Sequence, residues 1–245
     1  MSRSTIGLVT EGGTDYDLLC ALLGKWFGPE VMFICLQPAD SSTENGSGWK
    51  GVRRWCQQTI GEYGSLRDYC DAIEPRLDGI VLQVDGDVVF EQDVELDAAF
   101  EGETRERRLV SVGGSKYDRF PLEAKGRALH ALVSDWLSGK DAGLLALCVP
   151  IDELETWIVA AYDSQTYHRP PDYPIEALVL PADSVIGHAA EYHGIRVHRR
   201  DGRLKKNRSV FRNFHSQVTT EWKTVASVCS MASVFEDEVM KALGK

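Results

Sequence analysis

Residues 79–88 read GIVLQVDGDV, and this stretch decides how the rest of the chain is interpreted. Its first half is apolar and rich in β-branched residues, with no charge before Asp85. A run of this length and composition predicts a central strand that is buried on both faces, as in a parallel sheet. The run ends at two acids, Asp85 and Asp87, which are separated by a single glycine.

These two acids stand where a ligand site is expected. Open α/β sheets bind ligands just beyond the carboxyl ends of their strands, and residues two apart on an extended chain point to the same side. Two carboxylates at such a place, with Gly86 between them to let the backbone come close, suit a hard divalent cation such as Mg²⁺. The alternative is a solvated Asp-Gly turn that only ends the strand.

The composition is that of an ordinary globular protein. The chain has 245 residues, 43% of them hydrophobic and 26% charged, which fits one large domain or a domain with a small appendage. No apolar run approaches the length of a membrane-spanning helix, and the opening MSRSTIGLVTEGG does not resemble a signal peptide. The scattered cysteines form no C-x-x-C pair, so we expect buried thiols in a reducing compartment and a cytoplasmic protein. They are Cys20, Cys35, Cys56, Cys70, Cys148 and Cys229.

The net charge of −10 hides two patches of opposite sign. Residues 85–103 contain eight acids and no Lys or Arg, whereas residues 196–212 contain eight Lys or Arg and one acid, Asp201. The overall charge argues against a protein that coats DNA through a uniformly basic surface. The basic segment alone remains a candidate for contact with a phosphate backbone, the alternative being a solvated loop.

Strands and helices alternate along the first two thirds of the chain, which predicts a mostly parallel sheet covered on both faces. The expected strands are 5–10, 31–36, 79–88 and 144–149, with a loop or short strand at 109–117. The expected helices are 15–26, 49–69 with a break near Gly61 or Gly64, 121–137 and 151–163, followed by 184–193 and a mostly helical 211–243.

Three of the expected strands end in acidic residues. Carboxylates brought from three strand ends to one edge of a sheet are costly unless a cation neutralises them. Helix capping and the helix dipole are the alternative explanation for the acids that begin helices. Residues two apart do not share a helix face, and of the pair at 153 and 155 we expect the second to face the site. The acids are Glu11, Asp15, Asp85, Asp87, Asp152, Glu153 and Glu155.

Two stretches together carry a family resemblance. IGLVTEGGTD at 6–15, followed by VLQVDGDV at 81–88, resembles the Toprim domain of topoisomerases, primases and overcoming-lysogenization-defect (OLD) nucleases. In that family a Glu after the first strand and an Asp-x-Asp after the third bind Mg²⁺ and act on phosphodiesters. PIDELETWIVAAYD at 150–163 looks like the acidic-Trp segment of stand-alone Toprim-like proteins, often found among anti-phage defence genes.

The resemblance covers about residues 5–163 and implies a fold and a division of the chain. It implies an α/β, Toprim-like (Rossmannoid) fold, with a mostly parallel sheet and helices on both faces. The catalytic core would be residues 1–165, and residues 166–245 would form a basic, mainly helical extension packed on it. The sequence departs from the family pattern at the second glycine of Glu11-Gly12-Gly13 and in the acidic insert at 88–105.

The resemblance also implies a nuclease that uses Mg²⁺ or Mn²⁺ to hydrolyse DNA or RNA, as an effector of anti-phage defence. OLD-type nucleases carry an acid that Glu155 matches and a later basic residue for which Lys205 or Lys206 is the nearest candidate. The implied catalytic residues are Glu11, Asp85, Asp87 and Lys206. The implied metal ligands are Glu11, Asp15, Asp85, Asp87 and Glu155. The candidate nucleic-acid contacts are Arg199, Arg200, Arg203, Lys205, Lys206 and Arg208.

Two other functions stay open. A Toprim-like scaffold without catalysis would dock a partner, commonly an ATPase, and a small-molecule phosphohydrolase or phosphotransferase would suit the acidic insert. The glycine-rich turn 113–116 is a further candidate phosphate contact or an ordinary turn, and most tryptophans are expected in the core. The six histidines have no paired metal-ligand spacing such as H-E-x-x-H, so we expect them to be surface residues or nucleic-acid contacts.

Overall fold

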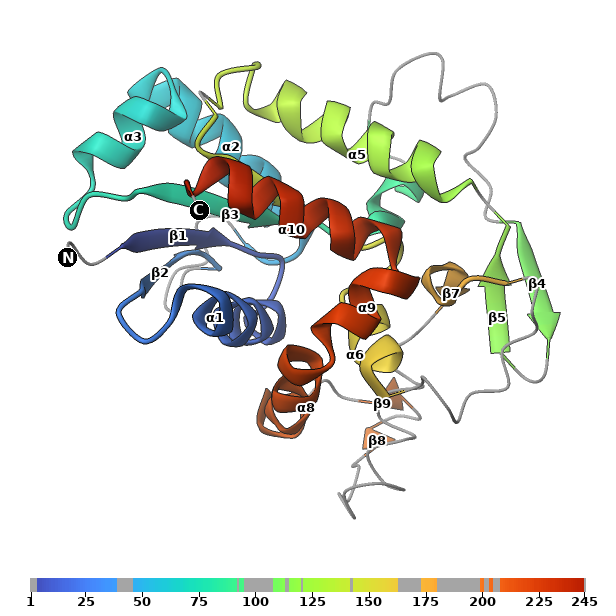
Figure 1. The fold of residues 1–245 in the computed structure, drawn as a ribbon. Coiled ribbons are helices and arrows are strands. Elements are labelled where there is room, and N and C mark those ends of the chain that lie inside the picture. The colour runs from blue at the N-terminus through green and yellow to red at the C-terminus, as the bar shows by residue number, and fades with distance from the viewer. Residues whose placement is uncertain are drawn as a thin grey trace.

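A computed structural model shows an α/β fold with a parallel four-stranded sheet flanked by helices (Figure 1). The predicted class, a parallel sheet with helices on both faces, is therefore confirmed. The structure describes residues 4–38, 46–91, 93–94, 108–112, 115–119, 121–141, 143–162, 173–179, 199–200, 203–204 and 208–244.

The sheet has the strand order β2-β1-β3-β6, and all three pairings are parallel. Strand β1 pairs with β2 on one side and with β3 on the other, so that Leu8 lies opposite both Cys35 and Val81. The chain thus runs outward from β1 to β2 and then returns across β1 to β3. The strands are β1 Thr5–Val9, β2 Met32–Gln37, β3 Gly79–Gln83 and β6 Leu145–Cys148.

Two apolar layers hold helices against the two faces of the sheet. Alternate residues of a strand point to opposite faces, and accordingly Val81 packs in the layer of α1 and α10, while Ile80 and Leu82 pack in the layer of α2, α3 and α5. In Figure 1, α1 lies below the sheet, and α2, α3 and α5 lie above it. The helices are α1 Gly13–Phe27, α2 Trp49–Tyr63, α3 Leu66–Ala72, α5 Leu122–Trp136, α6 Glu155–Tyr162, α8 Arg208–Thr220, α9 Trp222–Val228 and α10 Ser230–Ala242.

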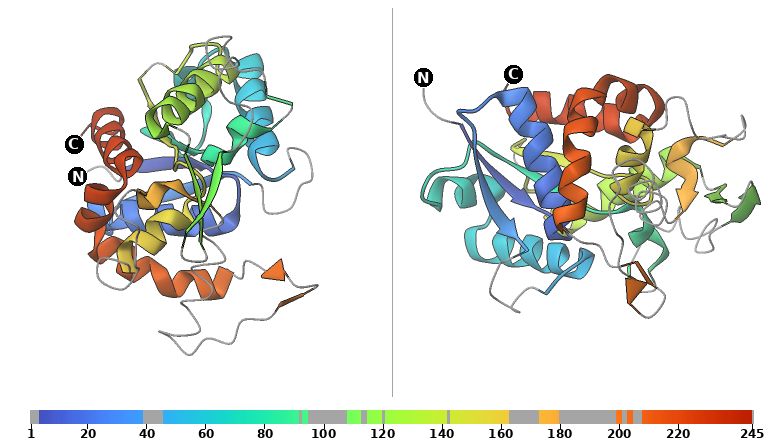
Figure 2. Two further views of the ribbon diagram at one scale, coloured as in Figure 1. Left: turned by 90° about the vertical axis from the view of Figure 1, so that its right-hand side faces the viewer. Right: turned by 90° about the horizontal axis from the view of Figure 1, so that it is seen from below.

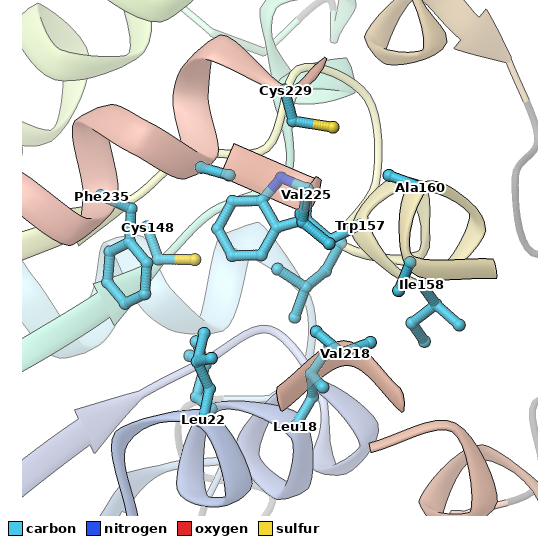
Figure 3. Packing of buried hydrophobic residues seen from close by; sticks show 14 of the residues in the cluster. Leu18, Leu22, Cys148, Trp157, Ile158, Ala160, Val218, Val225, Cys229 and Phe235 are labelled. Atoms are coloured by element: carbon cyan, nitrogen blue, oxygen red, sulfur yellow. The ribbon is translucent and has the colours of Figure 1, made fainter. Parts of the chain in front are cut away.

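The three C-terminal helices pack on the layer that contains α1. Figure 3 shows Trp157 of α6 enclosed by side chains of α1, β6 and the C-terminal helices. Its ring lies 5.4 Å from that of Trp222 and 5.7 Å from that of Phe235. Seen from below, α1 and α8 lie side by side (Figure 2). Burying aromatic side chains of this size contributes strongly to stability, so α6 is held firmly against α9 and α10.

The break expected in the helix at 49–69 is confirmed at Gly64, where φ is 83°, and α3 begins after Ser65, whose hydroxyl accepts a hydrogen bond from the Asp68 amide. Other segments differ from the expected ones. Residues 109–112 and 115–118 form two antiparallel strands of a second, three-stranded sheet. The expected helix at 184–193 lies outside the described residues. The smaller elements are β4 Leu109–Val112, β5 Ser115–Asp118, η2 Ile175–Ala177, β7 Leu178–Val179, β8 Arg199–Arg200 and β9 Arg203–Leu204.

The central strand is shorter than predicted, which corrects one step of the sequence argument. Strand β3 ends at Gln83, and a 3₁₀ helix, η1 (Gly86–Phe90), begins directly after Asp85. Asp85 and Asp87 therefore do not alternate along one extended strand. They are brought together by a tight turn instead, and Asp87 lies in the first turn of η1.

The other broad expectations concern tryptophans, cysteines and membrane spans. Trp49, Trp55, Trp136, Trp157 and Trp222 are buried, as expected for core residues. All six cysteines are free thiols, four of them buried and Cys20 and Cys35 half-buried. Within the described ranges, each helix is too short or too polar to cross a membrane.

We expect Gly86→Ala to destabilise the fold, because a Cβ at this position would overlap the carbonyl oxygen of Ile151. Forcing extra volume into a packed site typically costs about 1–3 kcal/mol. The matched control is Gly61→Ala in α2, where a Cβ meets nothing within 4 Å and the helix gains up to about 1 kcal/mol. Urea unfolding of both variants measures the difference, and equal stabilities would show that η1 and the Ile151 loop are not in close contact.

Candidate functional site

The strand order creates a switch point between β1 and β3. The chain leaves β1 towards β2 on one side and leaves β3 towards β6 on the other, and ligands of open α/β sheets bind outside the carboxyl ends of the strands at such a place. Strand β1 ends two residues before Glu11, and β3 ends two residues before Asp85. The structure therefore brings these two acids to the edge of the sheet at which open α/β sheets bind ligands.

A closed ring of hydrogen bonds joins the two strand ends. The Glu11 amide donates to the side-chain oxygen of Gln83 at 3.0 Å, and the Gln83 side-chain amide donates to the Asp85 carboxylate at 2.7 Å. The Asp85 amide then donates to the Glu11 carboxylate at 2.8 Å. Gln83 is fully buried, and the sequence analysis missed it. The available signal was a polar side chain inside an otherwise apolar strand, which needs buried hydrogen-bond partners.

The other four predicted metal ligands lie close enough to Asp85 to interact with it. Burial raises the pKa of Asp85 well above its ordinary value, and the charges of four neighbouring carboxylates raise it further. In decreasing order of effect these are Glu11, Asp15, Glu155 and Asp87. The three strand ends thus deliver their acids to one place, as the chain order predicts.

The pKa of Glu11 is raised by the same two causes, burial and neighbouring negative charge. Burial is the largest cause of its raised pKa, and the charges of Asp87 and Asp15 add to it. Backbone hydrogen bonds from Asp85 and from Trp49, at the start of α2, act in the opposite direction, and the pKa is raised to about 8. At neutral pH the cluster therefore keeps a proton on Glu11 unless a cation replaces it.

Asp15 and Glu155 begin the two helices that frame the cluster. Both are buried, in the first turns of α1 and α6. The residue that caps α1 is Gly12, and a Cβ there would lie 3.0 Å from the Asp15 carboxylate. Gly12 therefore leaves Asp15 the room it occupies, while the amides at the start of α1 can face an anion.

The second glycine of the motif has a separate role. A Cβ at Gly13 would lie 3.4 Å from a guanidinium nitrogen of Arg208, at the start of α8. Arg208 also donates to both carboxylate oxygens of Asp17, in one case at 2.7 Å, and Arg212 donates to the same carboxylate at 2.9 Å. Burial alone would raise the pKa of Asp17, but these hydrogen bonds outweigh it and the pKa is lowered.

The structure describes only some of the predicted nucleic-acid contacts. Arg208 is ion-paired to Asp17 and lies beside the first turn of α1. The backbone at Arg199, Arg200 and Arg203 forms the two-stranded pair β8–β9. Lys205 and Lys206, including the candidate catalytic lysine, lie outside the described residues. Only Arg208 can therefore be placed by its side chain, and it lies close to the cluster.

A buried lysine next to the site was not found from the sequence. The Lys125 ammonium donates to the Ile151 carbonyl at 3.1 Å and lies 3.4 Å from Asp118 and 3.7 Å from Asp152. It also lies 4.6 Å from the centre of the Phe90 ring. Lys125 thus ties α5 to η1 and to the loop before α6. The sequence contained one indication of its burial: Lys125 precedes Leu129 by one helical turn and so lies on the apolar face of α5.

Carboxylate oxygens are the donors that Mg²⁺ and Mn²⁺ prefer, and the crowded negative charge suits a cation. In the part of the chain that the structure describes, no three Asp, Glu, His or Cys side chains surround one point closely enough to hold an ion. One oxygen of Glu11 is engaged by the Asp85 amide. Ion binding at these residues therefore requires side-chain rotation within the cluster.

Comparison of the chain with protein-family models, with curated proteins and with solved structures gives no match. The arrangement of the site is consequently the basis for inferring what the protein does.

We expect the metal-free protein to lose stability as the pH rises from 5.5 to 8.5. The folded-state pKa of Glu11, about 8, exceeds the ordinary value of 4.5, so the folded state binds more protons and stability falls as pH rises through this window. Glu11→Gln keeps an acceptor for the Asp85 amide and removes the titration.

Urea unfolding in EDTA at the two pH values measures this effect. The stability of Glu11→Gln relative to the unchanged protein should rise by at least the ~1.4 kcal/mol that one pKa unit represents. Glu62→Gln, at an exposed position of α2, is the control and should follow the unchanged protein. Parallel pH profiles for all three proteins would contradict the protonation of Glu11.

Proposed function

We propose that the protein is a metal-dependent nuclease with a Toprim-like core, which uses Mg²⁺ or Mn²⁺ to hydrolyse phosphodiester bonds of nucleic acid. The observation that carries the proposal is the gathering of four carboxylates, Glu11, Asp15, Asp87 and Glu155, around the buried carboxylate of Asp85. Their order along the chain, a Glu after β1 and an Asp-x-Asp after β3, is the order of the Toprim motif.

The position of each residue indicates its proposed role. Glu11, Asp15, Asp85, Asp87 and Glu155 would hold the cation. When bound, such an ion polarises a phosphodiester and lowers the pKa of a coordinated water molecule. Gln83 would orient the carboxylates of Asp85 and, through the backbone, Glu11, since it bridges the two strand ends.

The substrate side of the proposal rests on positive charge near the start of α1. The amides at the N-terminus of a helix favour a phosphate group, and the Arg208 guanidinium lies against Gly13 at this point. Arg208 belongs to the basic segment 196–212, whose charge density suits a polymer of phosphates. Lys206, from the same segment, remains the predicted catalytic lysine.

The test is cleavage of supercoiled plasmid, single-stranded DNA and RNA with Mg²⁺ or Mn²⁺ and with EDTA. We expect cleavage in metal, with at least a ~100-fold loss in Asp85→Asn and Glu11→Gln, because loss of residues at a metal site typically costs 10–100-fold or more. Glu62→Gln should retain full activity. Cleavage that persists in both site variants would place the activity elsewhere.

The remaining outcomes separate the other functions. Metal binding without cleavage, lost in Asp85→Asn, would indicate an enzyme that a partner such as an ATPase must switch on. Hydrolysis of free nucleotides without cleavage of polymers would indicate a small-molecule phosphohydrolase. Absence of both metal binding and cleavage would leave the acidic cluster as a docking surface.

We further expect Gln83→Met to weaken Mg²⁺ binding by about 10–100-fold, the usual effect of losing a group that orients metal ligands. Methionine keeps the length of the side chain and removes both hydrogen bonds of Gln83 to Glu11 and Asp85. Isothermal titration of the metal-free protein measures the affinity. An unchanged affinity would show that the hydrogen-bond ring does not orient the ligands.

A further inference from the structure

A small cavity lies between α1, α6 and α8, directly beside the acidic cluster. Its volume is about 10 Å³, which is close to the space of one water molecule. Two of the proposed metal ligands, Asp15 and Glu155, line it from the starts of α1 and α6. The other lining residues are Thr14, Leu18, Leu154, Ile158, Phe211 and His215.

His215 adds an imidazole, a common metal ligand, to the two carboxylates that line this cavity. It lies on α8, and only 8% of it is exposed. Its Nε2 atom is buried and makes no hydrogen bond to any part of the chain that the structure describes. Buried polar atoms nearly always have a partner, so an imidazole nitrogen left without one beside a cavity with two carboxylates points to a missing ligand.

The prediction that the histidines are surface residues or nucleic-acid contacts is wrong for His215, which is buried. It lies one turn after Arg212 on α8, and the charged groups that act on it are Asp17 and Arg212. Burial is the largest influence on this imidazole, and it lowers the pKa. Because apolar side chains surround the His215 imidazole, it is not available as a surface contact for nucleic acid.

We propose that this cavity is a transition-metal position, in which Asp15, Glu155 and His215 bind a divalent ion of the Mn²⁺ or Zn²⁺ class. This inference rests on the proposed function, since it adds a ligand and an ion class to the same site. Imidazole together with carboxylates suits Mn²⁺, Fe²⁺ and Zn²⁺, whereas Mg²⁺ prefers oxygen donors alone.

The charges of this set balance. Two carboxylates and one neutral imidazole around a divalent ion sum to zero, and burying an uncompensated charge among apolar side chains is costly. The cavity is otherwise lined mainly by Leu, Ile and Phe side chains. The three donors come from helices that are packed against one another, so short side-chain rotations into the cavity would complete the set.

Pulsed electron paramagnetic resonance of Mn²⁺ bound to the full chain tests the proposal directly. A coordinated imidazole gives a ¹⁴N modulation in the spin echo, and protein grown with ¹⁵N-histidine should replace it by a ¹⁵N signal. In His215→Gln we expect the modulation to vanish and the Mn²⁺ dissociation constant to rise at least about tenfold. Mg²⁺ affinity should change less than about twofold.

His130→Gln is the matched control. His130 lies on α5, half-exposed, and its ring is 3.4 Å from the Glu238 carboxylate, outside the residues that line the cavity. This variant should keep the modulation and the Mn²⁺ affinity. The labelled, unsubstituted protein answers the question even if His215→Gln fails to fold.

The failures of the two proposals are distinguishable. Bound Mn²⁺ without histidine modulation, or modulation that survives in His215→Gln, would overturn the transition-metal position and leave Mg²⁺-dependent cleavage standing. Histidine modulation in a protein that cleaves no nucleic acid would support the metal position and contradict the nuclease. Absence of any bound Mn²⁺ would also overturn this proposal, and the cleavage assay alone would then decide the nuclease.

Discussion

Repulsion among the carboxylates around Asp85 is the constraint on which the rest of the structure depends. Five acids lie close enough to interact, and most of them are buried, where like charges cost far more than in water. The fold tolerates this because β1 and β3 are paired in parallel and fix the two strand ends, and because Gln83 bonds to both. Protons on Glu11 and Asp85, or a cation in their place, relieve the remaining repulsion.

The surrounding core keeps these acids from moving apart. Lys125 joins α5 to η1 and to the loop before α6, and Gly86 allows that loop to touch η1. On the other side of the sheet, Trp157 is enclosed by the C-terminal helices and fixes α6, which begins with Glu155 (Figure 3). Packing in both apolar layers therefore fixes the elements that carry the acids, and it prevents electrostatic repulsion from moving these elements apart.

The sequence predicted what depends on local pattern. Apolar runs located the four strands of the sheet, and acids after three of them located the cluster, because parallel strand ends must meet at one edge. Gln83, Lys125 and His215 were missed, since a polar residue among apolar ones acquires its role only from partners distant in the chain. The predicted placement of Asp87 on an extended strand was wrong for a related reason. The chain turns into η1 at Gly86, which packs closely on Ile151, a residue distant in the sequence.

The C-terminal helices belong to the site physically, although the motif ends before them. Asp17 of α1 binds Arg208 and Arg212 of α8, and the apolar side chains of Phe211 and Phe214 are buried in the same layer. These contacts bring His215 to the cavity beside Asp15 and place Arg208 against the first turn of α1. The C-terminal helices thus bring a guanidinium group and an imidazole to a cluster that is otherwise acidic, and the proposals of a bound metal and a phosphate-containing substrate both depend on this pairing.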